Sequence, residues 1–120
     1  MATEFTLTAR PILVSSATTT QPLKDALDVS HYDEIDAVCT IDAIVGSGSL
    51  SIHLLTGMQR ESETGWVELL AFTNSNLNAA GKSEVKNAST KLLKYLRWEV
   101  TDLNSATSIT FDIGGMLRKR

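Results

Sequence analysis

The chain has 120 residues and a formal net charge of -3, with 42% hydrophobic and 21% charged residues. That length fits one domain, and that balance of apolar and charged residues excludes an intrinsically disordered chain. The mild acidity argues against nucleic acid or an anionic membrane surface as a partner. The single cysteine excludes an intrachain disulfide and a multi-cysteine zinc site.

The sequence has neither the features of a membrane span nor those of a secretory signal. Its apolar runs fall short of the roughly 18–20 residues that cross a bilayer. Residues 1–5 lack a basic segment followed by an apolar stretch, which a secretory signal requires. We therefore expect a soluble protein that is made in the cytoplasm and has no membrane partner.

The N-terminal residues predict short strands. Phe5 and Leu7 alternate with polar residues, which indicates a strand. Residues 12–14 follow a proline and predict an edge strand, because proline cannot donate to a sheet ladder. We expect residues 1–20 to form an N-terminal strand or arm beside a single domain at residues 21–120.

The clearest pattern runs from Asp33 to Leu55. Apolar and polar residues alternate at residues 35–43 and again at residues 50–54, and this period of two is typical of strands with one buried face. Glycines at positions 46 and 48 interrupt the alternation. We therefore predict a hairpin in which residues 33–45 pair with residues 49–56.

Two later strands are also indicated. Residues 66–73 follow a polar loop and are apolar on both faces, which is typical of a central or covered strand. Ile109, Phe111 and Ile113 alternate with polar residues and predict the last strand. The faces of these strands predict a core, whose central members are Ile41, Leu54, Val100 and Phe111.

Two segments leave helix and strand open. Leu23 and Leu27 allow one or two helical turns within residues 21–32, although a bend at Pro22 fits as well. Residues 83–92 have apolar residues near the helical repeat but contain poor helix formers. Strand is favoured from about Leu92 onward. Together the segments predict an all-β antiparallel sandwich, jelly-roll-like or barrel-like, with at most one short helix.

The sequence predicts no catalytic, cofactor or metal site. His31 and His53 lack the spacing of metal ligands. Cys39 lies on an apolar strand face, which favours a buried thiol over a nucleophile. The acidic residues between Asp33 and Asp42 alternate along a strand, as on a solvated face, instead of converging as in a calcium loop. We therefore expect a protein that is not an enzyme.

The order of four patterned segments resembles the small β-sandwich virion proteins of tailed bacteriophages, of the capsid-decoration or minor structural type. The resemblance covers most of the chain from Asp33 onward and rests on patterning. The segments are residues 35–43, residues 48–56 leading through a polar loop to residues 65–70, residues 93–100, and residues 108–113 followed by a basic end.

The resemblance implies a structural protein of the virion that binds the major capsid protein or another virion protein. Many copies, as a homo-oligomer or bound to the lattice, would add weak contacts to a large total. The alternatives are a tail or head–tail connector component, or a carbohydrate-binding module with Trp66 as a stacking platform.

Three kinds of residue are candidates for partner contact. The N-terminal segment offers an edge that could pair with a neighbouring strand, Trp66 offers an aromatic anchor, and the basic end could meet an acidic surface. The candidates are Phe5, Leu7, Ile12, Val14, Trp66, Arg118, Lys119 and Arg120.

Overall fold

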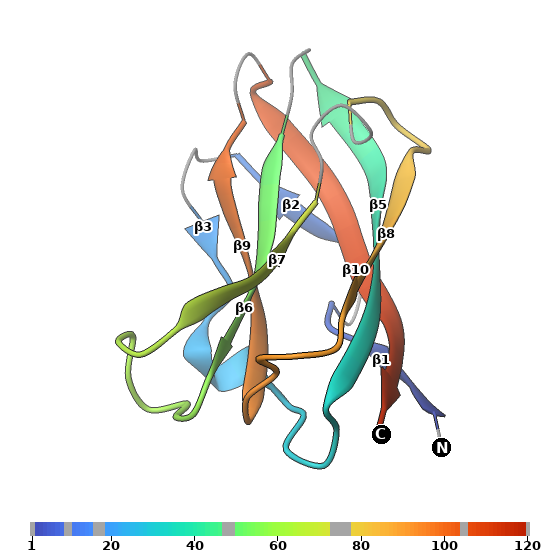
Figure 1. Cartoon of the computed structure of the whole chain (residues 1–120). Helices are drawn as coiled ribbons and strands as arrows, with labels where there is room; N and C mark the ends of the chain where they lie inside the picture. Colours follow the sequence, from blue (N-terminus) through green and yellow to red (C-terminus); the bar gives the residue numbers. More distant parts are fainter. Residues whose placement is uncertain are drawn as a thin grey trace.

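The alternating segments form two antiparallel sheets that pack face to face, so the expected all-β antiparallel sandwich is confirmed (Figure 1). The computed structural model describes residues 2–8, 11–15, 19–46, 50–72, 78–103 and 106–119. Over these residues, no helix is long and apolar enough to cross a bilayer.

Each sheet has five strands. The first sheet contains β1 (Ala2–Thr6), β2 (Ile12–Val14), β5 (Glu34–Val45), β8 (Ser83–Ala88) and β10 (Ser108–Arg118). The second sheet contains β3 (Thr19–Thr20), β4 (Leu27–Asp28), β6 (Ser51–Gly57), β7 (Val67–Ala71) and β9 (Tyr95–Asp102). A short 3-10 helix, η1 (Leu23–Asp25), precedes β4.

The strand order is that of a jelly roll. The first sheet runs β1-β10-β5-β8, and β2 pairs with the other half of β10. The second sheet runs β3-β9-β6-β7, and β4 pairs further along β9. β1 and β2 thus share one edge position, as do β3 and β4. Each of these two pairs is counted as one strand of a jelly roll. The paired strands β6 and β9 then lie, in sequence, between the paired strands β5 and β10, as they do in a jelly roll.

The predicted hairpin between residues 33–45 and 49–56 is wrong. β5 pairs with β10 and β8 in the first sheet, whereas β6 pairs with β9 and β7 in the second. The chain changes sheet after Gly46, which has a φ of 94°, and the other hairpin glycine, Gly48, lies outside the described residues. Both strands face the same core, so their apolar faces look continuous in the sequence although the strands do not pair.

The strand predicted to be central or covered lies at the edge of its sheet, so the central alternative is wrong. β7 ends the second sheet, and Val67 at its start is exposed. Its inward residue Leu70 and Phe72, which directly follows the strand, reach the core. The register shift at Leu54/Leu55 leaves Leu69 as an extra residue in β7. β7 and β8 are edge strands of opposite sheets, and they lie next to one another (Figure 1).

Both ambiguous segments are resolved. Within residues 21–32 the chain makes one turn of 3-10 helix, η1, before entering β4. Residues 83–88 form strand β8, whose pairing with β5 decides against a helix. Strand structure resumes at Tyr95, a few residues later than Leu92, the expected start.

The described N-terminal residues form strands of the first sheet. β1 and β2 both pair with β10. Phe5, Leu7 and Val14 are buried in the same core as the central strands. Burial of these three side chains ties the segment to the sheet.

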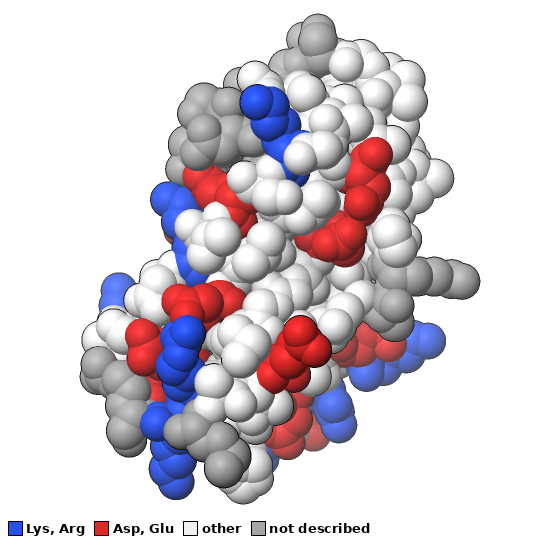
Figure 2. All heavy atoms as spheres, turned by 90° about the vertical axis from the view of Figure 1, so that its right-hand side faces the viewer, with Lys and Arg blue, Asp and Glu red and all other residues white. Residues whose placement is uncertain are grey.

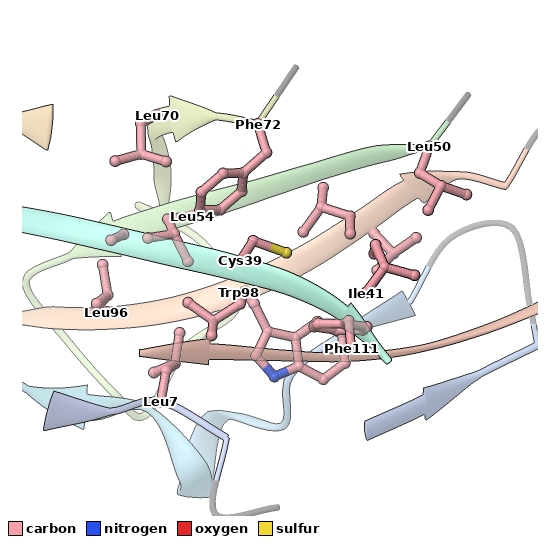
Figure 3. Close-up of a cluster of buried hydrophobic side chains, with 14 of the residues drawn as sticks. Leu7, Cys39, Ile41, Leu50, Leu54, Leu70, Phe72, Leu96, Trp98 and Phe111 are labelled. Carbon is pink, nitrogen blue, oxygen red and sulfur yellow. The ribbon is translucent and has the colours of Figure 1, made fainter. Parts of the chain in front are cut away.

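A core of buried apolar side chains fills the space between the sheets (Figure 3). Ile41, Leu54, Val100 and Phe111 are each 0% exposed, so the predicted core is confirmed. Trp98 also packs inside, with its ring 5.1 Å from that of Phe111 in an edge-to-face arrangement, which is a favourable geometry for aromatic pairs.

Truncation of Phe111 to alanine should lower the free energy of unfolding by about 3–5 kcal/mol, because it leaves a cavity beside Trp98. Chemical denaturation monitored by circular dichroism measures the change. Leu13→Ala on β2 is the matched control, since Leu13 is 68% exposed and its loss should cost at most about 0.5 kcal/mol. Equal effects of the two substitutions would contradict the assigned inner face of β10.

Cys39 should resist thiol reagents in the folded protein. Its side chain is fully buried on β5, and burial raises the pKa of the thiol to about 12, with the carboxylates of Asp112, Glu84 and Asp42 adding to the rise. Reaction with a chromogenic disulfide at pH 8 should therefore wait for unfolding by denaturant. Rapid labelling of the native protein would contradict the burial.

Candidate interaction surface

Trp66 is held in one position on the outer side of the second sheet. It is half-buried just before β7, and its Nε1 donates a hydrogen bond of 2.9 Å to the backbone oxygen of Ser62. The indole lies directly over Gly57 of β6, where an added Cβ would come within 2.9 Å of Cδ2 of the ring. Glycine at this position therefore makes room for the ring against the sheet.

Arg97 on β9 supports the same ring from the neighbouring strand. Its guanidinium carbon lies 5.0 Å from the Trp66 ring centroid, within the range of a cation–π contact. The side chain is only 3% exposed, and its Nη1 lies 2.9 Å from Oε1 of the solvent-facing Glu63. Nε donates to the backbone oxygen of Gln21 at 2.9 Å, and Nη2 donates to the same oxygen.

Gln21 connects this cluster to both sheets. Its Nε2 donates to the backbone oxygen of Leu7, while its Oε1 accepts from the backbone nitrogen of Trp98, each at 3.2 Å. Gln21 is itself buried, so these groups satisfy an amide that could not reach water. The position of Trp66 is thus fixed through Arg97 and Gln21 to the core.

A second aromatic ring with cations comes from Tyr95, the residue opposite the glycine that Trp66 covers. Tyr95 is opposite Gly57 in the β6–β9 register, with the guanidinium of Arg60 5.2 Å and the ammonium of Lys94 5.4 Å from its ring centroid. Arg60 also donates from Nη1 to the backbone oxygen of Ala26 at 3.3 Å.

Met58 adds exposed apolar area between two shallow hollows near these rings. It is 59% exposed and contributes to both hollows. One, of about 340 Å³, includes Gln59, Thr64 and Gly65, and the other, of about 300 Å³, lies between Tyr32 and residues 92–94. We call Met58, Arg60, Trp66, Tyr95 and Arg97 the Trp66 surface. Its residue types are those enriched where proteins bind one another.

The structure does not bring the candidate residues of the sequence together. Phe5, Leu7 and Val14 are buried and Ile12 is partly buried, so these side chains hold the N-terminal strands in place and offer little surface to a partner. Arg118 lies on the first sheet, where it pairs with Asp36. Lys119 is exposed beside it, and Arg120 lies outside the described residues. Trp66 is on the other sheet.

The sequence interpretation missed the partners of Trp66. Arg97 has the outward position in the alternation of β9, between the inward residues Leu96 and Trp98, which a period of two could have indicated. Nothing in the sequence indicated that the β6–β7 loop would place Trp66 against Arg97. That contact requires β6 and β9 to be neighbours, which only the fold determines.

Three polar side chains on the second sheet form a row of a carboxylate, an imidazole and a hydroxyl, which is the order of a hydrolase triad. His53 Nδ1 lies 2.7 Å from Oε1 of Glu68, and His53 Nε2 lies 3.2 Å from Oγ1 of Thr101. The row crosses neighbouring strands β7, β6 and β9. None of the described hollows that we identified is lined by these residues.

No family model matches the chain, and no curated protein matches it significantly. In the described part of the chain, no three His, Cys, Asp or Glu side chains are grouped so that they could hold a metal ion. The function must therefore be argued from the surface itself.

Replacement of Arg97 by alanine should lower the free energy of unfolding by about 2–3 kcal/mol, because it removes hydrogen bonds from a cation to the buried carbonyl of Gln21. Trp66 fluorescence should shift to longer wavelength as the ring loses its support. Arg60→Ala is the control, since Arg60 is exposed and should change stability by at most about 0.5 kcal/mol. A fluorescence spectrum unchanged by Arg97→Ala would contradict the proposed anchoring.

Proposed function

We propose that this chain is a non-enzymatic structural protein of a tailed-phage particle, which attaches to the outside of the capsid through the Trp66 surface. The observation that carries the proposal is the fixed position of a half-exposed Trp66, held by the guanidinium of Arg97 and the backbone oxygen of Ser62. An anchor that is held rigidly before binding loses little conformational freedom on association. Such anchors supply a large share of the binding energy of protein interfaces.

The fold agrees with this role. Jelly rolls occur in viral capsid domains and in lectins, although a fold alone does not determine function. The core between the sheets is occupied by apolar side chains, and the polar groups described on the outer faces contact one another across neighbouring strands. A rigid sandwich of this kind serves as a binding module without needing a catalytic cleft.

The resemblance of the patterned segments to phage virion proteins gives the proposed partner. A capsid presents many identical copies of one binding site, so a modest affinity at each site yields a strongly bound layer. In this role the protein would stabilise joints between shell subunits. Its location would be the virion, after synthesis in the host cytoplasm.

Trp66→Ala should weaken attachment to capsids by about tenfold or more, as expected for loss of a central aromatic anchor. The measurement is co-sedimentation with capsids from particles in which this gene has been deleted. Wild-type protein should bind these capsids and raise their resistance to heat. Val45→Ala, at a position on the first sheet that is 58% exposed, is the matched control and should bind like wild type.

Several results would overturn the proposal. If intact protein does not bind the capsids, or if no capsid, portal or protease gene lies near its own gene, the capsid role is rejected. Binding that is unaffected by Trp66→Ala would place the contact elsewhere on the molecule. Saturable binding to a sugar on a glycan array, lost in Trp66→Ala, would replace the capsid by a carbohydrate as the partner.

A further inference from the structure

The outer face of the first sheet contains a hollow that the backbone itself creates. The hollow has a volume of about 450 Å³ and lies over the pairing of β1, β10 and β5. The floor of the hollow is open at Gly114 of β10, which has no side chain. Val38 of β5 is opposite Gly114 in the register. An added Cβ at Gly114 would approach the backbone oxygen of Phe5 to 3.0 Å. The lining includes Glu4, Thr6, Val38, Asp112, Gly114 and Met116.

Acidic side chains of this face fall into two groups. Glu34 and Asp36 are compensated, since Nδ2 of Asn87 donates to both carboxylates and Arg118 pairs with Asp36. The hydrogen bond from Asn87 and the nearby guanidinium of Arg118 lower the pKa of Asp36. Asp36 is opposite the lining residue Met116, so this group borders the hollow, but its carboxylates already have their own donors.

The second group consists of Glu4 and Asp112, which line the hollow, and Asp42 beside Asp112. Among the residues that the structure describes, Glu4, Asp42 and Asp112 form no ion pair with a lysine or arginine. The bulge between β5 and β10 leaves Asp42 without an opposite residue and places it within hydrogen-bond reach of Asp112. Partial burial, and then the hydrogen bond and charge of Asp42, raise the pKa of Asp112. Asp112 therefore lines the hollow with a second carboxyl group, that of Asp42, close beside it.

Figure 2 views the molecule from the side of this sheet and shows acidic side chains in separate groups, with an uncharged area between them. Val38 and Met116 supply apolar surface to the hollow itself. Val85 of β8, which is the neighbour of Val38, is 63% exposed and extends the uncharged area toward the sheet edge. The face thus combines an apolar floor with unpaired negative charge.

We propose that this face binds a basic extended segment of a partner protein, with one lysine or arginine side chain of that segment in the hollow over Gly114. Long cationic side chains lay their apolar stem along apolar surface and keep the charged head at polar groups. The stem would contact Val38 and Met116, and the head would meet Glu4 and Asp112. Hydrogen bonds between such a cation and carboxylates are among the stronger ones in proteins.

The negative charge around the hollow favours one kind of binding partner over the others. Nucleic acid and an anionic membrane would be repelled by the carboxylates around the hollow, and so would the same face of a second copy. A basic protein segment is complementary to both the charge and the apolar floor. This surface is on the opposite sheet from the Trp66 surface, so the inference goes beyond the proposed function and does not depend on it.

The test uses an acetylated Gly-Arg-Gly-Arg-Gly peptide amide as the probe, because alternate arginines lie on one side of an extended chain. Backbone amide signals are followed by NMR during a titration. The signals of Val38, Gly114 and Met116 should shift saturably, and a Gly-Gln-Gly-Gln-Gly peptide should leave them in place. Added salt should weaken the binding.

Asp112→Asn should weaken binding of the arginine peptide by about fivefold or more, and Asp42→Asn should weaken it less. Glu61→Gln on the exposed β6–β7 loop changes the net charge equally and is the matched control, with an expected change below about twofold. Equal weakening by Asp112→Asn and Glu61→Gln would show general attraction to an acidic protein and overturn the proposal. Absence of saturable shifts in the wild-type protein would overturn it as well.

The variant Trp66→Ala separates this inference from the proposed function. It should bind the arginine peptide like wild type while losing capsid attachment. Loss of peptide binding in Trp66→Ala would mean that the peptide binds the other sheet, which contradicts the hollow as its site.

Discussion

The close approach of three backbones at Gly114 and Gly115 is the constraint on which the first sheet depends. An added Cβ at Gly115 would lie 1.9 Å from the backbone oxygen of Asp36, and one at Gly114 would lie 3.0 Å from that of Phe5. β10 pairs with β1 and β2 on one side and with β5 on the other, so every strand of this sheet except β8 meets it directly. The glycines that permit this packing also leave the hollow on the outer face, which makes one local feature responsible for both the architecture and a candidate binding surface.

The two outer faces of the sandwich differ in how their polar groups are satisfied. On the second sheet, Arg97 is surrounded by acceptors and an aromatic ring, and its charge is compensated within the chain. On the first sheet, the carboxylates of Asp42 and Asp112 compete with one another. The first arrangement presents a rigid aromatic side chain, and the second presents charge that a partner can neutralise.

Much of the fold follows from the sequence because alternation identifies inward residues strand by strand. Ile41, Leu54, Val100 and Phe111 were predicted to share a core for that reason, and they do. Alternation does not identify which strand is the neighbour of which, so it suggested a hairpin where the chain changes sheet after Gly46.

The candidate site was less predictable than the fold for the same reason. Trp66 could be singled out by its residue type and its position after a charged loop. Its support by Arg97 depends on β6 and β9 being adjacent, and these strands are far apart in the sequence. The apolar residues of the N-terminal segment were assigned to partner contact because the sequence does not show that β10 is their neighbour. The structure instead buries them in the core.

The nested order of the strands has a consequence for how the protein is made. β5 pairs with β10 and β1 pairs with the far end of β10, so the first sheet joins segments from the two ends of the described chain. Folds dominated by such distant pairings close slowly, on a scale of about milliseconds to seconds. During synthesis, β5 and β1 leave the ribosome long before the strand between them exists. Until residue 118 has been made, both lack β10 as a neighbour, and their open edges and apolar faces favour pairing with other chains.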